Sequence, residues 1–183
     1  MFPFFRGSDC INIKYRDGRK NFRMHGGAER VLYGINDIAE TLIWVEGEID
    51  KLSVEVAGFA NCVSVPDGAP TPNTKNYSTK FDYLDAPELA KVSKHVIAVD
   101  NDAPGKRLQE ELTRRLGAEN CLIVTWPDDC KDANEVLITH GANELSACIE
   151  TASPLPIAGA FEVAEYLSAL DDHYAHGQPK GAK

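Results

Sequence analysis

Apolar and polar residues alternate one by one near the start of the chain. Residues 11–16 follow this pattern, an Asp-Gly turn comes next, and residues 21–24 resume it. Single alternation on both sides of a short turn predicts an antiparallel β-hairpin. Because neighbouring side chains of a strand point to opposite faces, one face of this hairpin carries Asn12, Lys14 and Arg16.

A different pattern begins near residue 41, where short apolar runs alternate with amphipathic stretches. The apolar runs predict buried strands at residues 42–45, 62–65, 96–99 and 122–125. Helices are expected at about residues 48–57 and 105–116, where apolar residues recur at helical spacing. Strands that alternate with helices predict an α/β fold with a central, mostly parallel four-stranded sheet flanked by helices.

Short helices and loops are expected after residue 139. Residues 143–151 predict one helix, and the two prolines of residues 153–156 break it. Residues 161–174 predict an amphipathic helix, and residues 177–183 form a polar end.

The composition is typical of a globular protein, with 43% hydrophobic and 26% charged residues in a chain of 183. No apolar run approaches the length of a membrane span, and no signal peptide is recognised, so no membrane partner is expected. The five cysteines form no Cys-x-x-Cys pair. We therefore expect reduced thiols rather than a zinc ribbon.

Charge is distributed unevenly along the chain. The net charge of −9 argues against a general nucleic-acid binder. Residues 1–30, however, hold seven Lys or Arg against three acids, so they carry +4 and the remainder carries −13. A basic region beside an acidic one could bind an anion and a metal together, whereas scattered solvated charge is the alternative interpretation.

Carboxylates follow several of the predicted strands. Glu46 ends the first strand, Asp100 and Asp102 follow the third, and residues 128–132 follow the fourth. Ligands of open parallel sheets bind beyond the carboxyl ends of the strands, so these acids should meet at one edge. Carboxylates held together repel one another unless a cation joins them, and Mg²⁺ prefers oxygen ligands. The pattern predicts a magnesium site that could clamp a phosphoryl group.

Each acidic element also has a plainer interpretation. Glu46-Gly-Glu48 could simply favour a helix N-terminus through the helix dipole. Asp100-x-Asp102 could be a surface loop, and Asp132 could cap the helix that begins at Ala133, in addition to any metal role. The occurrence of all of them at successive strand ends favours the joint site.

Four segments together resemble the Toprim domain of phage-type primase-helicases, a group that includes Twinkle. The segments are Val45–Asp50, Ser64–Ala69, Asp100–Gly105 and Lys131–Glu135. The upstream segment Lys14-Tyr-Arg-Asp-Gly-Arg-Lys-Asn-Phe22 also resembles the basic strand region of this family. One departure is Ala103-Pro-Gly105, where the family commonly has Ala-Gly. The resemblance covers about residues 3–183.

The resemblance implies RNA primer synthesis on single-stranded DNA by metal-dependent nucleotidyl transfer. Catalysis would fall to Glu46, Asp100 and Asp102, and these three with Asp132 would bind Mg²⁺, with Mn²⁺ as a substitute and no zinc. Nucleotide or template binding would involve Lys14, Arg16, Lys20, Gly47 and Lys106. For Lys14 and Lys20 a protective role at a solvated hairpin edge is the alternative.

The resemblance also implies a domain plan and partners. Residues 1–40 would be the remnant of an N-terminal primase subdomain, 41–140 the Toprim domain, and 141–183 a helical linker toward a helicase domain. The chain contains no Gly-x-x-x-x-Gly-Lys-Ser/Thr motif, so helicase and zinc-binding modules are expected in cis or in trans. The other expected partners are a single-stranded DNA template and NTPs.

Two other functions remain open from the sequence. The same acids could serve a Toprim-type nuclease that hydrolyses an existing phosphodiester, or the domain could be a non-catalytic replication assembly module. The basic hairpin favours the primase, because phosphate contacts need Lys and Arg. The expected compartment is the cytoplasm of a bacterial or phage-infected cell, with an organelle as the alternative.

Overall fold

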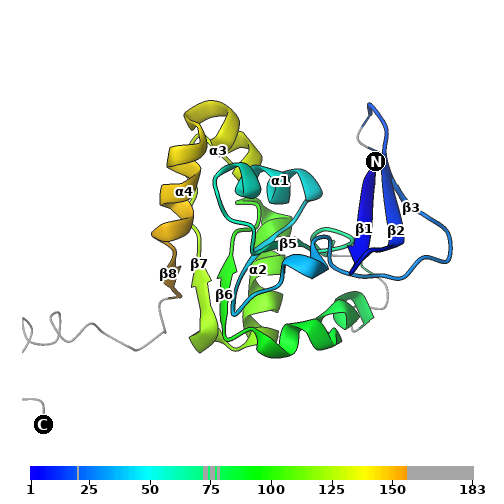
Figure 1. Ribbon diagram of the computed structural model, residues 1–183. Coiled ribbons are helices and arrows are strands. Elements are labelled where there is room, and N and C mark those ends of the chain that lie inside the picture. The colour runs from blue at the N-terminus through cyan, green and yellow to red at the C-terminus, as the bar shows by residue number, and fades with distance from the viewer. Residues whose placement is uncertain (20, 72–73, 75–76, 78, 156–183) are drawn as a thin grey trace, which may run out of the picture.

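Two sheets of different size make up the described part of the chain (Figure 1). The computed structural model describes residues 1–155 apart from Lys20 and residues 72–73, 75–76 and 78. The helix predicted at 161–174 and the polar end at 177–183 lie outside the described residues, as does Lys20.

The smaller sheet is antiparallel and lies at the N-terminus. Its strands are β1 (Phe2–Arg6), β2 (Asp9–Arg16) and β3 (Phe22–Met24), in the order β1-β2-β3. The predicted hairpin is β2 with β3, and β1 adds a third strand. The polar face of β2 is the one turned inward, because Asn12 and Lys14 are buried while Tyr15 is exposed.

The larger sheet has five strands in the order β5-β4-β6-β7-β8. The strands β4 (Thr41–Val45), β5 (Cys62–Ser64), β6 (Lys94–Ile97) and β7 (Cys121–Ile123) are parallel, as predicted. The helix expected at 143–151 does end before residues 153–156, but the sequence did not predict the strand that follows it. Ser153–Pro154 forms β8, a short antiparallel strand on β7. Proline is tolerated there because β8 is at the sheet edge.

Helices cover both faces of the larger sheet (Figure 1). On one face lie α1 (Glu48–Val56), α3 (Ala133–His140) and α4 (Ala142–Glu150), which pack against one another. On the other lies α2 (Ala103–Leu116). Four short 3-10 helices connect these elements: η1 (Ile35–Asp37), η2 (Thr79–Asp85), η3 (Pro87–Lys91) and η4 (Ala118–Asn120).

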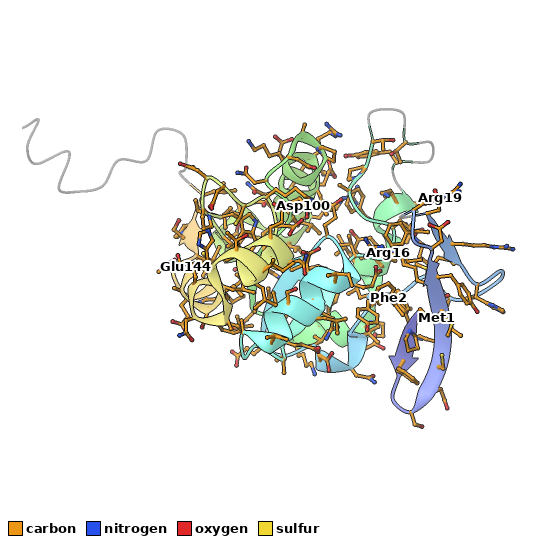
Figure 2. All side chains as sticks on the ribbon, turned by 90° about the horizontal axis from the view of Figure 1, so that it is seen from above. Met1, Phe2, Arg16, Arg19, Asp100 and Glu144 are labelled. Atoms are coloured by element: carbon orange, nitrogen blue, oxygen red, sulfur yellow. The ribbon has the colours of Figure 1, made fainter. Side chains whose placement is uncertain are left out.

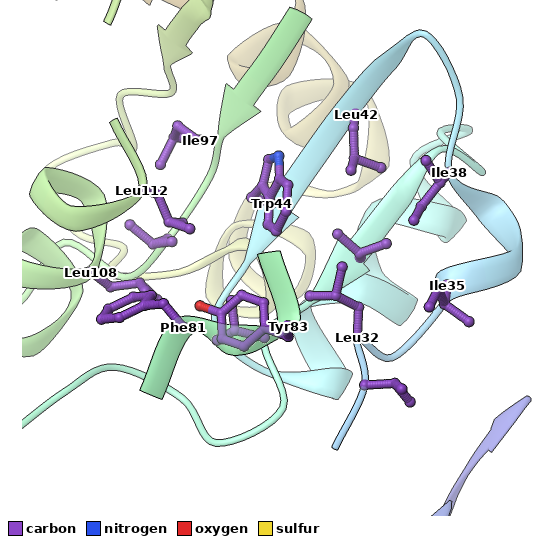
Figure 3. Close-up of a cluster of buried hydrophobic side chains, with 14 of the residues drawn as sticks. Leu32, Ile35, Ile38, Leu42, Trp44, Phe81, Tyr83, Ile97, Leu108 and Leu112 are labelled. Carbon is purple, nitrogen blue, oxygen red and sulfur yellow. The ribbon is translucent and has the colours of Figure 1, made fainter. Parts of the chain in front are cut away.

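Alternate residues of the central strand β4 supply both halves of the core. Trp44 packs with Ile97, Leu112 and the rings of η2 on one side (Figure 3). Its neighbour Ile43 packs on the other side among side chains of α1, α3 and α4. Full burial of each large apolar side chain contributes roughly 1.5–3 kcal/mol. This two-sided packing holds β4 and β6 in register, so that the residues that follow them reach the same edge.

Candidate active site

A cavity of about 630 Å³ lies where the two sheets meet. One wall comes from the turns after β4 and β6 and from the start of α3, and the other from β2 and β3. In Figure 2, Asp100 belongs to the first wall and Arg16 to the second, across the space from it. The lining residues that carry charge are Lys14, Arg16, Arg23, Glu46, Glu48, Asp50, Asp67, Asp100, Lys131, Asp132 and Glu135.

Glu46 lies in the turn between β4 and α1. Its Oε1 accepts a hydrogen bond from the backbone N–H of Ala69 at 3.1 Å. Its Oε2 is buried and has no hydrogen-bond partner among the described residues. Burial raises the pKa of Glu46 to about 7, and the charge of Asp100 adds to this rise. A buried carboxylate oxygen without a donor is a ready ligand for a cation.

Asp100 follows β6 and, like Glu46, lines the cavity. Burial raises the pKa of Asp100, and the ammonium of Lys131, 3.2 Å from its Oδ2, opposes that rise. The first turn of α2 packs directly against the Asp100 backbone. A Cβ at Gly105 would lie 1.9 Å from the Asp100 carbonyl oxygen, so only glycine allows this approach.

Asp102 has a different position from the other predicted acids. Its Oδ1 accepts a hydrogen bond from the Gly105 N–H at 2.8 Å, so Asp102 is the N-cap of α2. It is exposed, and neither Asp102 nor Lys106 is among the described residues that line the cavity. Asp102 is nevertheless close enough for its charge to contribute to the raised pKa of Glu46.

The position of Asp132 is compatible with both roles expected from the sequence, as the cap of a helix and as a metal ligand. Its Oδ1 accepts a hydrogen bond from the Glu135 N–H at 2.8 Å and so caps α3. Its Oδ2 lies 2.8 Å from the Nζ of Lys131, which also contacts Asp100. Sequence reasoning did not assign a role to Lys131, although it begins one of the quoted Toprim-like segments. In the structure it is the counter-ion between two acids.

Asp50 is an acid of the site that sequence reasoning missed. It lies on α1, and its Oδ1 accepts a hydrogen bond from the Asn134 N–H at 3.2 Å. Burial raises the pKa of Asp50 to about 7, helped by the charges of Asp132 and Asp100. A Cβ at Gly47 would lie 2.8 Å from its Oδ2, so Gly47 gives Asp50 room. The available signal was the position of Asp50 in the first turn of the predicted helix, directly after the Glu46-Gly47 turn.

The basic wall is tied to the acidic wall by a buried ion pair. Lys14 Nζ lies 2.7 Å from Glu48 Oε1 and also donates to the Pro66 carbonyl at 3.2 Å. Lys14 is only 8% exposed, so its charge is largely committed to holding the two sheets together. Arg16 is exposed at the cavity rim and remains available to a ligand.

The acids fit a hydrated Mg²⁺ better than a tightly caged ion. In the described part of the chain, no three of these carboxylates bring oxygens within 4.8 Å of one another. The ammonium of Lys131 contacts both Asp100 and Asp132 and so offsets their mutual repulsion. Mg²⁺ commonly keeps several waters and takes one or two carboxylates directly, so this wider spacing and the unpaired Glu46 oxygen suit it.

Among the described residues, the side chains of Asp129, Cys130 and His140 do bring metal-ligating atoms within 4.8 Å of one another. His140 Nε2 is 3.0 Å from both carboxylate oxygens of Asp129. This hydrogen-bonded pair explains the grouping without an ion.

The profile of the Toprim-like family matches residues 43–137, more than half of the chain. This chain belongs to the Toprim family. The matched region of this Toprim domain begins in β4 and ends in α3, so it contains Glu46, Asp50, Asp100 and Asp132. No helix in the described residues is long and apolar enough to cross a bilayer.

Relatives connect this Toprim domain to primases. The chain is 41% identical over 197 residues to the "Twinkle homolog protein, chloroplastic/mitochondrial" of Arabidopsis thaliana, which covers 98% of this chain and 28% of that protein. It is 43% identical over 171 residues to the "Primase homolog protein" of the same plant, which covers 85% of this chain and 51% of that one. The chain thus spans between about a quarter and a half of the length of these relatives.

A solved structure gives the same connection. It is a structure of bacteriophage T7 lagging-strand DNA polymerase interacting with primase domains bound to an RNA/DNA hybrid and dTTP. One of its chains matches with a TM-score of 0.67 and 25% identity, over 81% of this chain and 74% of that chain. The predicted resemblance to the Toprim domain of Twinkle-like, phage-type primase-helicases is confirmed.

Proposed function

We propose that this Toprim domain catalyses metal-dependent nucleotidyl transfer and synthesises RNA primers on single-stranded DNA. The observation that carries the proposal is the pairing of an acidic wall with a basic wall in one cavity. The acids can bind Mg²⁺, while Arg16 on the opposite wall can bind phosphates of a nucleotide or a template. A nucleic-acid binder without catalysis would not need the acids.

Glu46 and Asp100 are the central catalytic groups of this proposal. Glu46 Oε2 is the unpaired acceptor, and a carboxyl with a pKa of about 7 can take the proton of an attacking 3′-hydroxyl or act as a metal ligand. Asp100 and Asp132 would hold the metal beside it, with Asp102 acting from the N-cap of α2. Bound Mg²⁺ would neutralise charge on the phosphates during the displacement.

The positive residues have separate roles in the proposal. Lys14 fixes the basic wall through Glu48 and is a buried cation that lines the cavity. Arg16 contacts the phosphates. Lys106, which does not line the cavity, binds the nucleic acid from outside it, and Lys20 keeps its role in nucleotide or template binding. Gly47 serves the site by leaving room for Asp50. Lys131 orients Asp100 and Asp132 until the metal binds.

The proposed partners are single-stranded DNA and NTPs, with helicase and zinc-binding modules in cis or in trans. The similar bacteriophage T7 primase domains are bound to an RNA/DNA hybrid and dTTP, which supports this substrate class. The proposed domain plan has an N-terminal subdomain at residues 1–40, the Toprim domain at 41–140 and a linker at 141–183. Of the two expected compartments, an organelle agrees with the name of the first relative.

Incorporation of labelled ribonucleotides on single-stranded DNA tests the proposal directly. We expect short products that require Mg²⁺ or Mn²⁺ and disappear in Glu46→Gln and in Asp100→Asn. Glu144→Gln is the control, because Glu144 is an exposed acid on α4 that does not line the cavity. Loss of template without incorporation would replace the proposal with the nuclease. If neither incorporation nor metal-dependent cleavage occurs, the non-catalytic assembly module would be the remaining function.

A further inference from the structure

An exposed phenyl ring lies at the rim of the cavity, next to basic side chains. Phe22 on β3 is 53% exposed, more than Phe5 at 43% or Tyr15 at 37%. It lines the cavity beside Arg16, Arg23 and Lys14. The core of the chain offers large apolar clusters, so an aromatic residue outside them and inside a charged cavity requires an explanation.

The register of the N-terminal sheet explains why the ring faces the cavity. Phe22 is directly opposite Arg16, and Met24 is directly opposite Lys14. Directly opposite residues of antiparallel strands project from the same face, so Phe22 shares the inward-facing polar face of β2. Tyr15 is opposite Arg23 and projects from the other face, and it is not one of the described lining residues.

Two cations lie close to the ring. Lys14 Nζ lies 5.0 Å from the centroid of Phe22, and Arg16 Cζ lies 5.5 Å from it. Both distances are within the range of cation–π attraction, which holds the ring beside the two positive groups. An aromatic ring held beside basic side chains is the combination that binds single-stranded nucleic acid, because bases stack on the ring and phosphates contact the cations.

We propose that Phe22 is a stacking platform for a nucleobase at the mouth of the active-site cavity. The inference rests on the proposed function and deepens it, since it names the group that would hold a base of the template or of an incoming nucleotide. Arg16 contacts the neighbouring phosphate, and Lys14, held by Glu48, keeps the ring in place from its inner side. Stacking tolerates every base, so this contact would bind without reading sequence.

If Phe22 were only structural, it would hold Arg16 and Lys14 by packing alone and would not bind a base. Substitutions of different shape distinguish this structural role from base stacking. Phe22→Leu keeps apolar bulk but removes the aromatic face. Phe22→Trp enlarges that face. Tyr15→Leu removes an aromatic residue from the opposite face of the same sheet and is the matched control.

Binding is measured with single-stranded DNA containing one 2-aminopurine and, separately, with 2-aminopurine riboside triphosphate, both with Mg²⁺. We expect quenching on binding in the wild type, an affinity lowered about tenfold in Phe22→Leu, and retained affinity in Phe22→Trp and Tyr15→Leu. Quenching with the oligonucleotide alone assigns the platform to the template, and quenching with the nucleotide alone assigns it to the substrate. Thermal unfolding of each variant checks that the fold is intact.

Equal affinity and equal quenching of the wild type and Phe22→Leu would overturn the stacking role. Because the assay needs no turnover, it is independent of catalysis. Normal Phe22-dependent binding without primer synthesis would sink the proposed activity and leave the platform standing. Absence of wild-type binding to both probes would overturn both.

Discussion

Lys14 and Glu48 form a buried ion pair that joins the N-terminal sheet to the Toprim domain. Their Nζ and Oε1 atoms lie 2.7 Å apart, and the two residues are 8% and 2% exposed. Glu48 begins α1 directly after the Glu46-Gly47 turn. The pair therefore links the position of the basic wall to the turn that carries the catalytic acid.

Removing one partner of this pair should destabilise the protein strongly. We expect Lys14→Met to lower the free energy of unfolding by about 3–5 kcal/mol, because it leaves the Glu48 charge buried and unpaired. The double variant Lys14→Met/Glu48→Leu should recover much of this loss. Urea denaturation measures both. Arg114→Met is the control, since its pair with Glu111 is exposed and should contribute less than about 1 kcal/mol. Equal losses in Lys14→Met and Arg114→Met would contradict the role of burial.

Asp50 should make the metal-free protein less stable as pH rises. Its pKa is about 7 in the folded state, above the ordinary value for an aspartate. The folded protein therefore keeps a proton that the unfolded chain loses, and the stability present at low pH is lost as pH rises toward and through 7. We predict that Asp50→Asn raises the melting temperature at pH 8 and has little effect at pH 4. Calorimetry without metal tests this, and an equal gain at both pH values would point to packing instead of charge.

Lys131 should compete with Mg²⁺ for the same acids. Its ammonium contacts both Asp100 and Asp132, and these contacts raise its pKa above the ordinary value. We expect Lys131→Met to lower the melting temperature without metal and to increase the further stabilisation that Mg²⁺ gives. A thermal-shift titration with Mg²⁺ measures the two effects. A smaller Mg²⁺ effect in Lys131→Met would instead make the lysine a helper of metal binding. Lys94→Met, on the exposed start of β6, serves as the control.

Gly105→Ala should displace Asp100 through a clash with the Asp100 backbone. A new Cβ would meet the Asp100 carbonyl oxygen at 1.9 Å, so either α2 or the Asp100 turn must move. We predict that the free energy of unfolding falls by roughly 1–3 kcal/mol. We also predict that Mg²⁺ affinity falls by more than this loss of stability alone would cause. Gly26→Ala is the comparison, because nothing lies within 4 Å of a Cβ there. Urea unfolding and a Mg²⁺ titration measure the two effects. Unchanged Mg²⁺ affinity in Gly105→Ala would show that Gly105 does not position the metal site.

Much of the fold could be predicted from local pattern. The strands near residues 42, 62, 96 and 122 and the helices that follow the first and third of them were predicted from apolar runs and helical spacing, and the structure has them. The missed strand β8 is two residues long and includes a proline, so it has no periodicity to detect. Its formation depends on the free edge of β7.

The site was predictable only in part. The acids after strands could be named because parallel strands end at one edge, and Glu46, Asp100 and Asp132 do line one cavity. Asp102 lies outside the lining set because capping α2 takes its side chain. Asp50 was missed because its role depends on burial and on the charges of acids far away in the sequence. Lys131 was missed because its role depends on Asp100, which lies more than 30 residues before it.

The sequence by itself determined the Toprim secondary structure and the acids at its strand ends, because both depend on residues close together in the chain. Only the tertiary structure decided which charges are paired. It turned the polar face of β2 inward, committed Lys14 to Glu48 and placed Phe22 at the cavity rim. It also raised the pKa of Glu46 and Asp50 to about 7. The physical reason is that ion pairing and desolvation depend on distances across the fold, which local patterns do not contain.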